Sequence, residues 1–340
     1  LLYIDSIQDA RQFLSAARAI SQHKSVLVIK SGSSLLGAKA ATLHSKGQFG
    51  HDSVYDAAIK RTGMLRVHDL HELFAAVETL AYSNYLHGER LAIITNGGGL
   101  GVLAVDNLVN EGGMLADLDA PLLEKLDHCL PINWSRNNPI DMIGDADPKR
   151  YATALTHLMD SEKIDAILIM HSPSALSDSE NSAQAIIDVI QKHPKRKQKN
   201  ILTNWTGEES AKPARLLFGK AKIPTFRTPK GAISAFMHLV QYRRNKKLLQ
   251  ETPTTMPENL NYNSQYATQY IQKMVDSKTL TTKLDTYLAT PLLASYHLNT
   301  INTEVAKNEQ EALELAKVIG FPLAVKINSP DIEYKSQVHG

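Results

Sequence analysis

Short apolar runs alternate with longer amphipathic stretches along most of the chain. Ser25–Lys30 (SVLVIK), Leu91–Thr95 (LAIIT) and Ala166–Met170 (AILIM) are continuous apolar runs with the length of buried parallel strands. Ile7–Ser21 and Leu70–Tyr82 carry apolar residues at helical spacing. This alternation predicts an α/β fold with doubly wound, mostly parallel sheets, whose ligand sites lie at the carboxyl ends of strands.

The same pattern continues to about residue 249 and then changes. Further strands are expected at Leu1–Ile4, Met114–Leu115, Asn200–Thr203 and Pro224–Phe226. Further helices are expected at Ser53–Arg61 (capped by Asp52 and ended by Gly63), Leu122–Cys129, Tyr151–Met159, Ser182–Lys192, Glu208–Lys220 and Gly231–Leu249, and a loop at Gly37–Gly50. Gln250–Leu284 is polar and contains prolines, as a linker does. After it we expect helices at Pro291–Tyr296 and Gln310–Ile319, and strands at Thr303–Val305 and Leu323–Ile327.

Composition narrows the class of protein only a little. The 340 residues are 43% hydrophobic and 21% charged, and 37 Lys and Arg against 35 Asp and Glu give a net charge of +2. Such a balance argues neither for nor against nucleic acid, and we expect no nucleic-acid partner. Cys129 is the only cysteine, which favours a reducing cytoplasm, and no apolar run predicts a membrane span. Both ends look cut, so we expect a fragment of a longer protein.

The run Ile93–Asp106 (IITNGGGLGVLAVD) predicts a strand, a glycine turn and a helix start. Gly97, Gly98, Gly99 and Gly101 let the backbone turn sharply and approach a ligand. The free N–H groups of the helix start suit an anion such as phosphate or sulfate. Close strand-to-helix packing without a ligand is the alternative, because it needs glycine as well.

Several runs together resemble the NDP-forming acyl-CoA synthetase superfamily, relatives of succinyl-CoA synthetase. They are KSGSSLLGAKAATLH, TNGGGLGVLAVD, WSRNNPIDMIGDA and AKVIGFPLAVKINSPDIEYKSQVHG, in the family's order. Three narrower runs resemble the Pat-type protein lysine acetyltransferases of bacteria, in which a synthetase-like region precedes a GNAT domain. These runs are HSPSA, LTNWTGEES and IPTFRTPKGAISAFMHLVQYRRNKKLLQETP.

The resemblance implies a domain organisation. Two flavodoxin-like ligase domains would cover residues 1–67 and 68–251, a linker 252–284, and the beginning of an ATP-grasp domain 285–340. A CoA-binding domain would precede residue 1, and a GNAT domain would lie further on.

The family's chemistry passes a phosphoryl group through a histidine, and aligning Lys30–Asp52 with the family pattern puts His44 at that position. Imidazole carries a phosphoryl group well at neutral pH. Ser31 and Gly32 would bind phosphate on the same loop. The sequence departs from the family at Ser33, where relatives have arginine, and in the residues flanking His44. An exposed loop histidine without a chemical role, and a histidine that only binds, are therefore alternatives.

The other site residues also follow from the resemblance. Gly97, Gly98, Gly99 and Gly101, with the side chain of Asn96, would form a second phosphate site. Asn138 and Asp141 match the family's NPxD and would face it, or form a purely structural turn. Asp145 and Asp147 lack the spacing of a calcium loop, and we expect no metal bound by the residues of the site. Lys326 and Lys335 would contact nucleotide phosphates.

Three functions remain open from the sequence. The first is the synthetase-like region of a bacterial CoA-dependent protein lysine acetyltransferase, which binds acyl-CoA, nucleotide or phosphate and regulates a GNAT domain that modifies protein lysines. The second is an active NDP-forming synthetase that turns acetyl-CoA, ADP and phosphate into acetate, ATP and CoA through His44. The third is a non-catalytic effector-binding or oligomerisation module. The cofactors implied are CoA or acetyl-CoA and ATP or ADP with Mg, and a homo-oligomer is compatible with each function.

Overall fold

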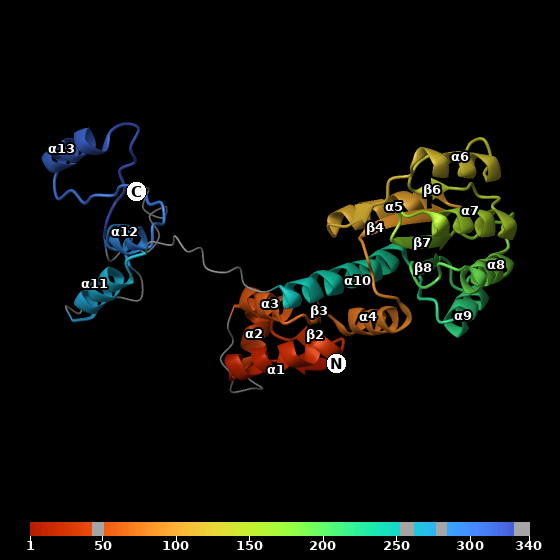
Figure 1. The fold of residues 1–340 in the computed structure, drawn as a ribbon, viewed down its shortest axis with the longest axis horizontal. Coiled ribbons are helices and arrows are strands. Elements are labelled where there is room, and N and C mark those ends of the chain that lie inside the picture. The colour runs from red at the N-terminus through yellow and green to blue at the C-terminus, as the bar shows by residue number, and fades with distance from the viewer. Residues whose placement is uncertain (43–50, 252–261, 277–283, 330–340) are drawn as a thin grey trace. The chain divides into compact units, whose positions relative to one another are not determined.

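The computed structural model describes residues 1–42, 51–251, 262–276 and 284–329. The chain divides into two compact units, Leu1–Thr252 and Pro253–Gly340 (Figure 1). Each unit is described by itself. His44 and Lys335 lie outside the described residues.

A small parallel sheet opens the first unit. Its strands are β1 (Leu2–Ile4), β2 (Leu27–Lys30) and β3 (Leu65–Val67), in the order β1-β2-β3. The helices between and after them are α1 (Ala10–His23), α2 (Leu35–Thr42), α3 (Asp52–Arg61) and α4 (Leu70–Tyr82). Asp9 and Asp69 accept hydrogen bonds from the first turns of α1 and α4, which explains where these two helices begin.

Two predictions in this region are wrong. Leu35–Thr42 is helix α2, although a loop was expected from Gly37, because Ser34 accepts a hydrogen bond from the Gly37 N–H and caps the turn. Asp52 is the first residue of α3 and not its cap. Its carboxylate instead accepts hydrogen bonds from Arg66 on β3, at 2.7 and 2.9 Å.

A larger parallel sheet follows, with the order β5-β4-β7-β8-β9 and with β6 paired to β4. Its strands are β4 (Arg90–Thr95), β5 (Met114–Leu115), β6 (Ile140–Asp141), β7 (Ala166–His171), β8 (Asn200–Trp205) and β9 (Thr225–Phe226). Its helices are α5 (Gly98–Asn110), α6 (Ala120–Cys129), α7 (Pro148–Asp160), α8 (Ser179–Lys192), α9 (Lys212–Lys220) and α10 (Pro229–Gln250). The prediction of an α/β fold with parallel sheets is confirmed.

Helices cover both faces of the larger sheet, as the strand sequences require. Along β4, Ala92 and Ile94 point into one apolar cluster, whereas Leu91 and Ile93 point into the other. Successive side chains of a strand face opposite sides, so a strand that is apolar at every position must be buried on both. This explains the continuous apolar runs of the sequence.

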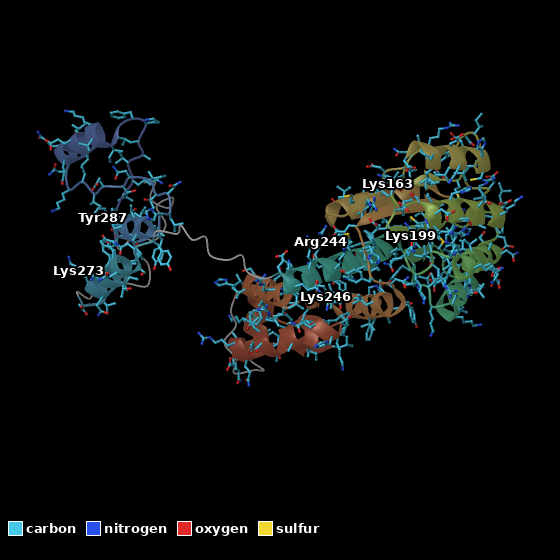
Figure 2. All side chains as sticks on the ribbon, viewed as in Figure 1. Lys163, Lys199, Arg244, Lys246, Lys273 and Tyr287 are labelled. Atoms are coloured by element: carbon cyan, nitrogen blue, oxygen red, sulfur yellow. The ribbon has the colours of Figure 1, made fainter. Side chains whose placement is uncertain are left out.

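Helix α10 joins the two sheets of the first unit. Its first half contributes Ala232, Ile233 and Phe236 to the core of the larger sheet. Its second half reaches the smaller sheet, where the Asn245 side chain donates to the Met64 carbonyl at 2.6 Å. Lys246, labelled in Figure 2, donates to the Ser21 carbonyl at 2.5 Å. One helix therefore packs on both ligase-like regions.

The second unit contains α11 (Ser264–Asp276), α12 (Thr286–Ser295) and α13 (Glu309–Ile319). Helix α11 lies inside the expected linker, since Ala267 and Met274 give that stretch a buried apolar side. The strands expected at Thr303–Val305 and Leu323–Ile327 have no regular secondary structure. A strand needs a partner strand to bond with, and the described part of this unit offers none.

No helix among the described residues is long and apolar enough to cross a membrane.

Candidate functional site

The glycine turn lies between β4 and α5, at the carboxyl end of the larger sheet. Thr95 Oγ1 accepts a hydrogen bond from the Gly97 N–H at 2.9 Å and donates to the Gly97 carbonyl at 3.0 Å, which fixes the turn. Gly97 is the N-cap of α5 and brings no side chain to cap it. The first N–H groups of α5 are thus presented by backbone alone, the arrangement that binds anions at helix starts.

The four glycines of the turn have different reasons to be glycine. A Cβ at Gly97 would lie 2.8 Å from the Cβ of Ser172, and one at Gly101 would lie 3.1 Å from Thr95 Cγ2. A Cβ at Gly98 would lie 2.5 Å from Asp141 Oδ2, but no atom of the residues that the structure describes lies within 4 Å of a Cβ at Gly99. Packing explains three of the glycines, and Gly99 marks the open side of the turn.

Asn96 ties the turn to the neighbouring strand. Its side-chain Oδ1 accepts from the Ser172 N–H at 2.7 Å, and its Nδ2 donates to the Ser172 carbonyl at 2.9 Å. Ser172 directly follows β7. Both ends of the amide are occupied by backbone groups, so Asn96 positions the turn.

Asn138 is built into the sheet beside β4. Its Oδ1 accepts from the Ile93 N–H at 3.0 Å, and its Nδ2 donates to the Leu91 and Ala116 carbonyls, each at 2.9 Å. Because β5 pairs with β4 at residues 90–91 and β6 at 94–95, the Asn138 side chain fills the place between these two short strands. The structure places this residue in the sheet, away from the open side of the turn.

Asp141 is the predicted site residue whose side chain reaches the glycine turn. It lies on β6 opposite Thr95, and its Oδ1 accepts from the Ile143 N–H at 3.0 Å. Its Oδ2 is the atom that would meet a Cβ at Gly98. The side chain brings a negative charge to the start of α5.

His171 ends β7 and is a buried residue that packs behind the turn. It stacks on Trp205 with ring centroids 5.1 Å apart, and its Nδ1 is 3.4 Å from Tyr151 Oη. Burial lowers the pKa of His171 to about 4, although Asp178 acts in the opposite direction. The imidazole is therefore neutral at pH 7, but its burial and low basicity make it a poor general base for a nucleophile.

A second group of polar residues lies at the carboxyl end of β1 and β2. Ser31 Oγ donates to Asp5 Oδ1, and the buried Lys30 ammonium donates to the Ser31 and Gly32 carbonyls. Burial lowers the pKa of Lys30, whereas the carboxylate of Asp52 raises it. Gly32 has φ +66°, and a Cβ there would lie 3.2 Å from the Ala38 backbone. The hydroxyl of Ser31 is thus bonded within the protein.

Asp5 and Lys30 were missed as site residues from the sequence. Lys30 ends an apolar strand, and a charged residue in that position is a usable signal, but Asp5 lies 26 residues from its partner Ser31. Only the parallel pairing of β1 with β2 brings Asp5 and Ser31 together.

Lys326 belongs to the second unit, where its side chain is exposed on a segment without regular secondary structure.

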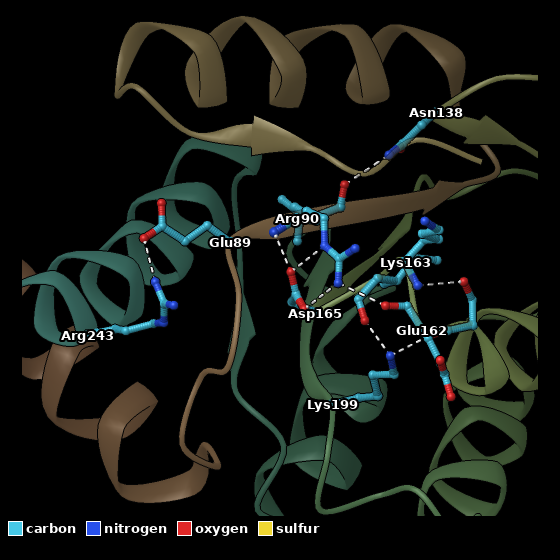
Figure 3. A network of polar contacts seen from close by, with 11 residues as sticks. Glu89, Arg90, Asn138, Glu162, Lys163, Asp165, Lys199 and Arg243 are labelled. Carbon is cyan, nitrogen blue, oxygen red and sulfur yellow. Dashed lines mark hydrogen bonds and ion pairs between the residues drawn. The ribbon is translucent and has the colours of Figure 1, made fainter. Parts of the chain in front are cut away.

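The opposite, amino end of the larger sheet has a different kind of polar network (Figure 3). Arg90 donates to the Asp165 carboxylate through Nε at 2.8 Å and through Nη2 at 2.9 Å. Lys199 donates to the Ser161 carbonyl at 2.5 Å, and Arg243 of α10 donates to Glu89 at 3.0 Å. Burial opposes ionisation of Asp165, but the hydrogen bonds from Arg90 outweigh it, so its pKa lies below the ordinary value. These charges are paired and hold strands and helices together.

Comparison with known families divides the chain into three parts. Residues 1–80 match the succinyl-CoA ligase like flavodoxin domain, residues 91–244 the ligase-CoA domain, and residues 276–340 an ATP-grasp domain. These three domains, in this order, support the NDP-forming, succinyl-CoA-synthetase-like acyl-CoA synthetase family that the motifs of the chain resemble.

Individual relatives agree with this class. The chain is 29% identical over its whole length to acetate–CoA ligase [ADP-forming] I of Archaeoglobus fulgidus and 32% identical to acetate–CoA ligase [ADP-forming] of Methanocaldococcus jannaschii. It covers 47% of each, so it spans about half the length of these relatives. Among solved structures, the dinucleotide-forming acetyl-coenzyme A synthetase 1 of Ca. Korarchaeum cryptofilum, in complex with phosphate and ADP, is similar with a TM-score of 0.70 and 26% identity. That similarity covers 75% of this chain and 55% of the other.

The prediction of a region from a bacterial protein lysine acetyltransferase is wrong. The relatives named above are CoA ligases, and their organisms are archaea. One of the runs that suggested it, Ile223–Pro253, contains β9 and the scaffold helix α10. The residues of this run pack the two sheets together, which a synthetase needs as well. They carry no acetyl-transfer chemistry.

Proposed function

We propose that this chain is the ligase portion of an ADP-forming acyl-CoA synthetase, which converts acyl-CoA, phosphate and ADP into the free acid, CoA and ATP. The observation that carries the proposal is the glycine turn, where an uncapped helix start is open at Gly99, within a ligase-CoA domain. The similar Korarchaeum enzyme was solved with phosphate and ADP, which supports phosphate as the anion of the turn.

His44 is proposed as the residue that carries the phosphoryl group between two sites. It follows β2 and α2 in the chain, in the flavodoxin-like ligase domain. The helix start at the glycine turn would stabilise the phosphoryl dianion, since helix N-termini favour negative charge. Asp5, Lys30 and Ser31 would shape the loop that leads to it.

The remaining partners are proposals of the same kind. Lys326 and Lys335 would contact nucleotide phosphates in a complete ATP-grasp domain, with Mg as the counter-ion. We also propose domain boundaries at residues 67, 251 and 284. A cytoplasmic location is part of the same proposal, and the free thiol of Cys129 is consistent with it. Two relatives are named as alpha subunits, which supports an assembly of more than one chain.

The proposal is tested by ATP formation. The intact protein is incubated with acetyl-CoA, ADP and phosphate, and ATP is measured with a coupled luciferase assay. We expect ATP from the wild type and a loss of at least about a thousandfold in His44→Gln, because a covalent carrier has no substitute. His51→Gln is the matched control. Like His44, His51 precedes α3 in the chain, and its side chain makes no capping hydrogen bond to that helix.

Two outcomes would contradict the proposal in different ways. If neither acetyl-CoA nor longer acyl-CoA substrates give ATP, the protein is not an active synthetase. Undiminished ATP formation in His44→Gln would leave the enzyme class intact and remove the role of His44.

A further inference from the structure

The carboxylate of Asp141 lies at the start of α5, where the proposed phosphate would bind. Since a Cβ at Gly98 would be 2.5 Å from Asp141 Oδ2, and a Cα–Cβ bond is about 1.5 Å long, this oxygen lies within about 4 Å of the Gly98 Cα. The distance is short enough for the carboxylate and a bound phosphate to share the same helix start.

The loop around Asp141 holds the carboxylate in this orientation. The Asp141 N–H donates to Ser135 Oγ at 2.9 Å, and the Ile143 N–H donates to Asp141 Oδ1 at 3.0 Å. On the next residue, the Met142 N–H donates to the Thr95 carbonyl of β4 at 2.8 Å. With Oδ1 held by Ile143, the other oxygen is directed at the turn.

The charge of Asp141 acts on its surroundings. Burial raises the pKa of the Tyr151 phenol, a hydrogen bond with the Asn96 backbone lowers it, and the nearby Asp141 carboxylate raises it further. A phosphate dianion at the start of α5 would be repelled by this carboxylate. The dipole of α5 attracts the phosphate, and Asp141 opposes that attraction.

We propose that Asp141 weakens phosphate binding at the glycine turn, so that the phosphoryl group is released quickly enough for turnover. The inference rests on the proposed function and adds a role to it: Asp141 acts through its charge on the affinity of the turn for phosphate. In a reversible synthetase a dianion must both enter and leave this site. A fixed carboxylate beside Gly98 keeps the helix start occupied by negative charge when phosphate is absent.

The test compares three full-length proteins by isothermal titration calorimetry with inorganic phosphate. Asp141→Asn removes the charge and keeps an Oδ1 that can accept from the Ile143 N–H. Asp106→Asn is the control, since Asp106 is exposed on the same helix, eight residues and about 12 Å beyond Gly98. We expect phosphate to bind at least about tenfold more tightly to Asp141→Asn than to the wild type, and within about twofold of the wild type in Asp106→Asn.

Steady-state kinetics of ATP formation give a readout that a merely structural role would not move. In Asp141→Asn the KM for phosphate should fall at least about tenfold. The kcat should fall with it, because the phosphoryl group leaves the glycine turn more slowly.

The outcomes separate the inference from the function on which it rests. Phosphate binding to the wild type with no gain in Asp141→Asn overturns the role of Asp141 and leaves the glycine turn as a phosphate site. Weaker binding in Asp141→Asn also overturns it. An absence of phosphate binding in all three proteins overturns the phosphate site itself, and the role of Asp141 with it.

Discussion

The two ends of the larger sheet carry different kinds of polar groups. At the amino end, Arg90, Asp165 and Lys199 form paired charges and hydrogen bonds to carbonyl groups. At the carboxyl end, the glycine turn and Asn96 leave an open helix start with the Asp141 carboxylate beside it. The same strands therefore end in a stabilising network on one side and in a surface prepared for an anion on the other.

This contrast shows why a charged residue in a sheet is a poor indicator of function by itself. The network at the amino end consists of charged side chains, but each of them is hydrogen-bonded within the protein. The carboxyl end instead presents the start of α5 without a capping side chain, and an anion can bind the N–H groups of such a helix start. The following predictions test that division, beginning with the largest effect.

Asn138→Ala should lower the free energy of unfolding by about 3–5 kcal/mol. The change leaves the Ile93 N–H and the Leu91 and Ala116 carbonyls without their side-chain partner in a buried position. Urea unfolding followed by circular dichroism measures it. Asn107→Ala, which removes one exposed bond to the Leu103 carbonyl, is the control and should cost less than about 0.5 kcal/mol. Similar losses in both variants would contradict the place of Asn138 in the sheet.

Acid should destabilise the protein through His171. Its pKa is about 4 in the folded protein and near 6.5 when exposed, so the unfolded chain takes up the proton first as the pH falls. The stability is complete above about pH 6.5 and is lost down to about pH 4, by about 3 kcal/mol. Urea midpoints across this range should show a smaller loss for His171→Phe. The exposed control His71→Gln should behave like the wild type, and equal pH dependence in all three would contradict the assignment.

Asp165→Asn should lower the free energy of unfolding by about 2 kcal/mol without changing ATP formation per folded molecule. It leaves Arg90 and the buried Lys199 without their carboxylate. Asp188→Asn, which breaks an exposed pair with Lys192 at 3.7 Å, is the control and should change stability by less than about 0.5 kcal/mol. A loss of specific activity in Asp165→Asn at unchanged stability would show that the amino end takes part in the chemistry.

Gly98→Ala and Gly99→Ala should differ by about 1–2 kcal/mol. The new methyl group at Gly98 collides with Asp141, whereas at Gly99 it meets no atom in the described part of the chain, and alanine is a better helix former than glycine. Thermal unfolding should show a lowered midpoint for the first variant and an unchanged or raised one for the second. The opposite order would mean that the open side of the turn is at Gly98.

The sequence predicted the regular parts of the fold because their determinants are local. Leu70–Tyr82 is helix α4 within the expected bounds, since Asp69 caps it and its apolar spacing is helical. Helix α2 and strand β6 were not predicted. Each is short, and β6 exists only because Ile140 and Asp141 pair with the end of β4.

For the candidate site, residue types were easier to predict than roles. The glycine turn and Asp141 lie close together, and their role as a phosphate site stays a prediction, whereas Asn96 and Asn138 have side chains that bond to backbone from distant segments. An amide in a loop has the same letter whether it faces a ligand or completes a sheet. Only the parallel register of the strands shows which of these two roles an amide has. His44 and Lys335 lie outside the described residues, so their roles stay predictions.

The position of helix α10 late in the chain also affects how the protein folds during its synthesis. The smaller sheet is complete at Val67, but the residues of α10 that cover it, from Tyr242 to Leu249, are synthesised much later. At about 5–20 residues per second, that delay is roughly ten to thirty seconds on the ribosome. During this interval the apolar face that will meet α10 is uncovered, so the nascent chain must be protected there until its own scaffold helix emerges.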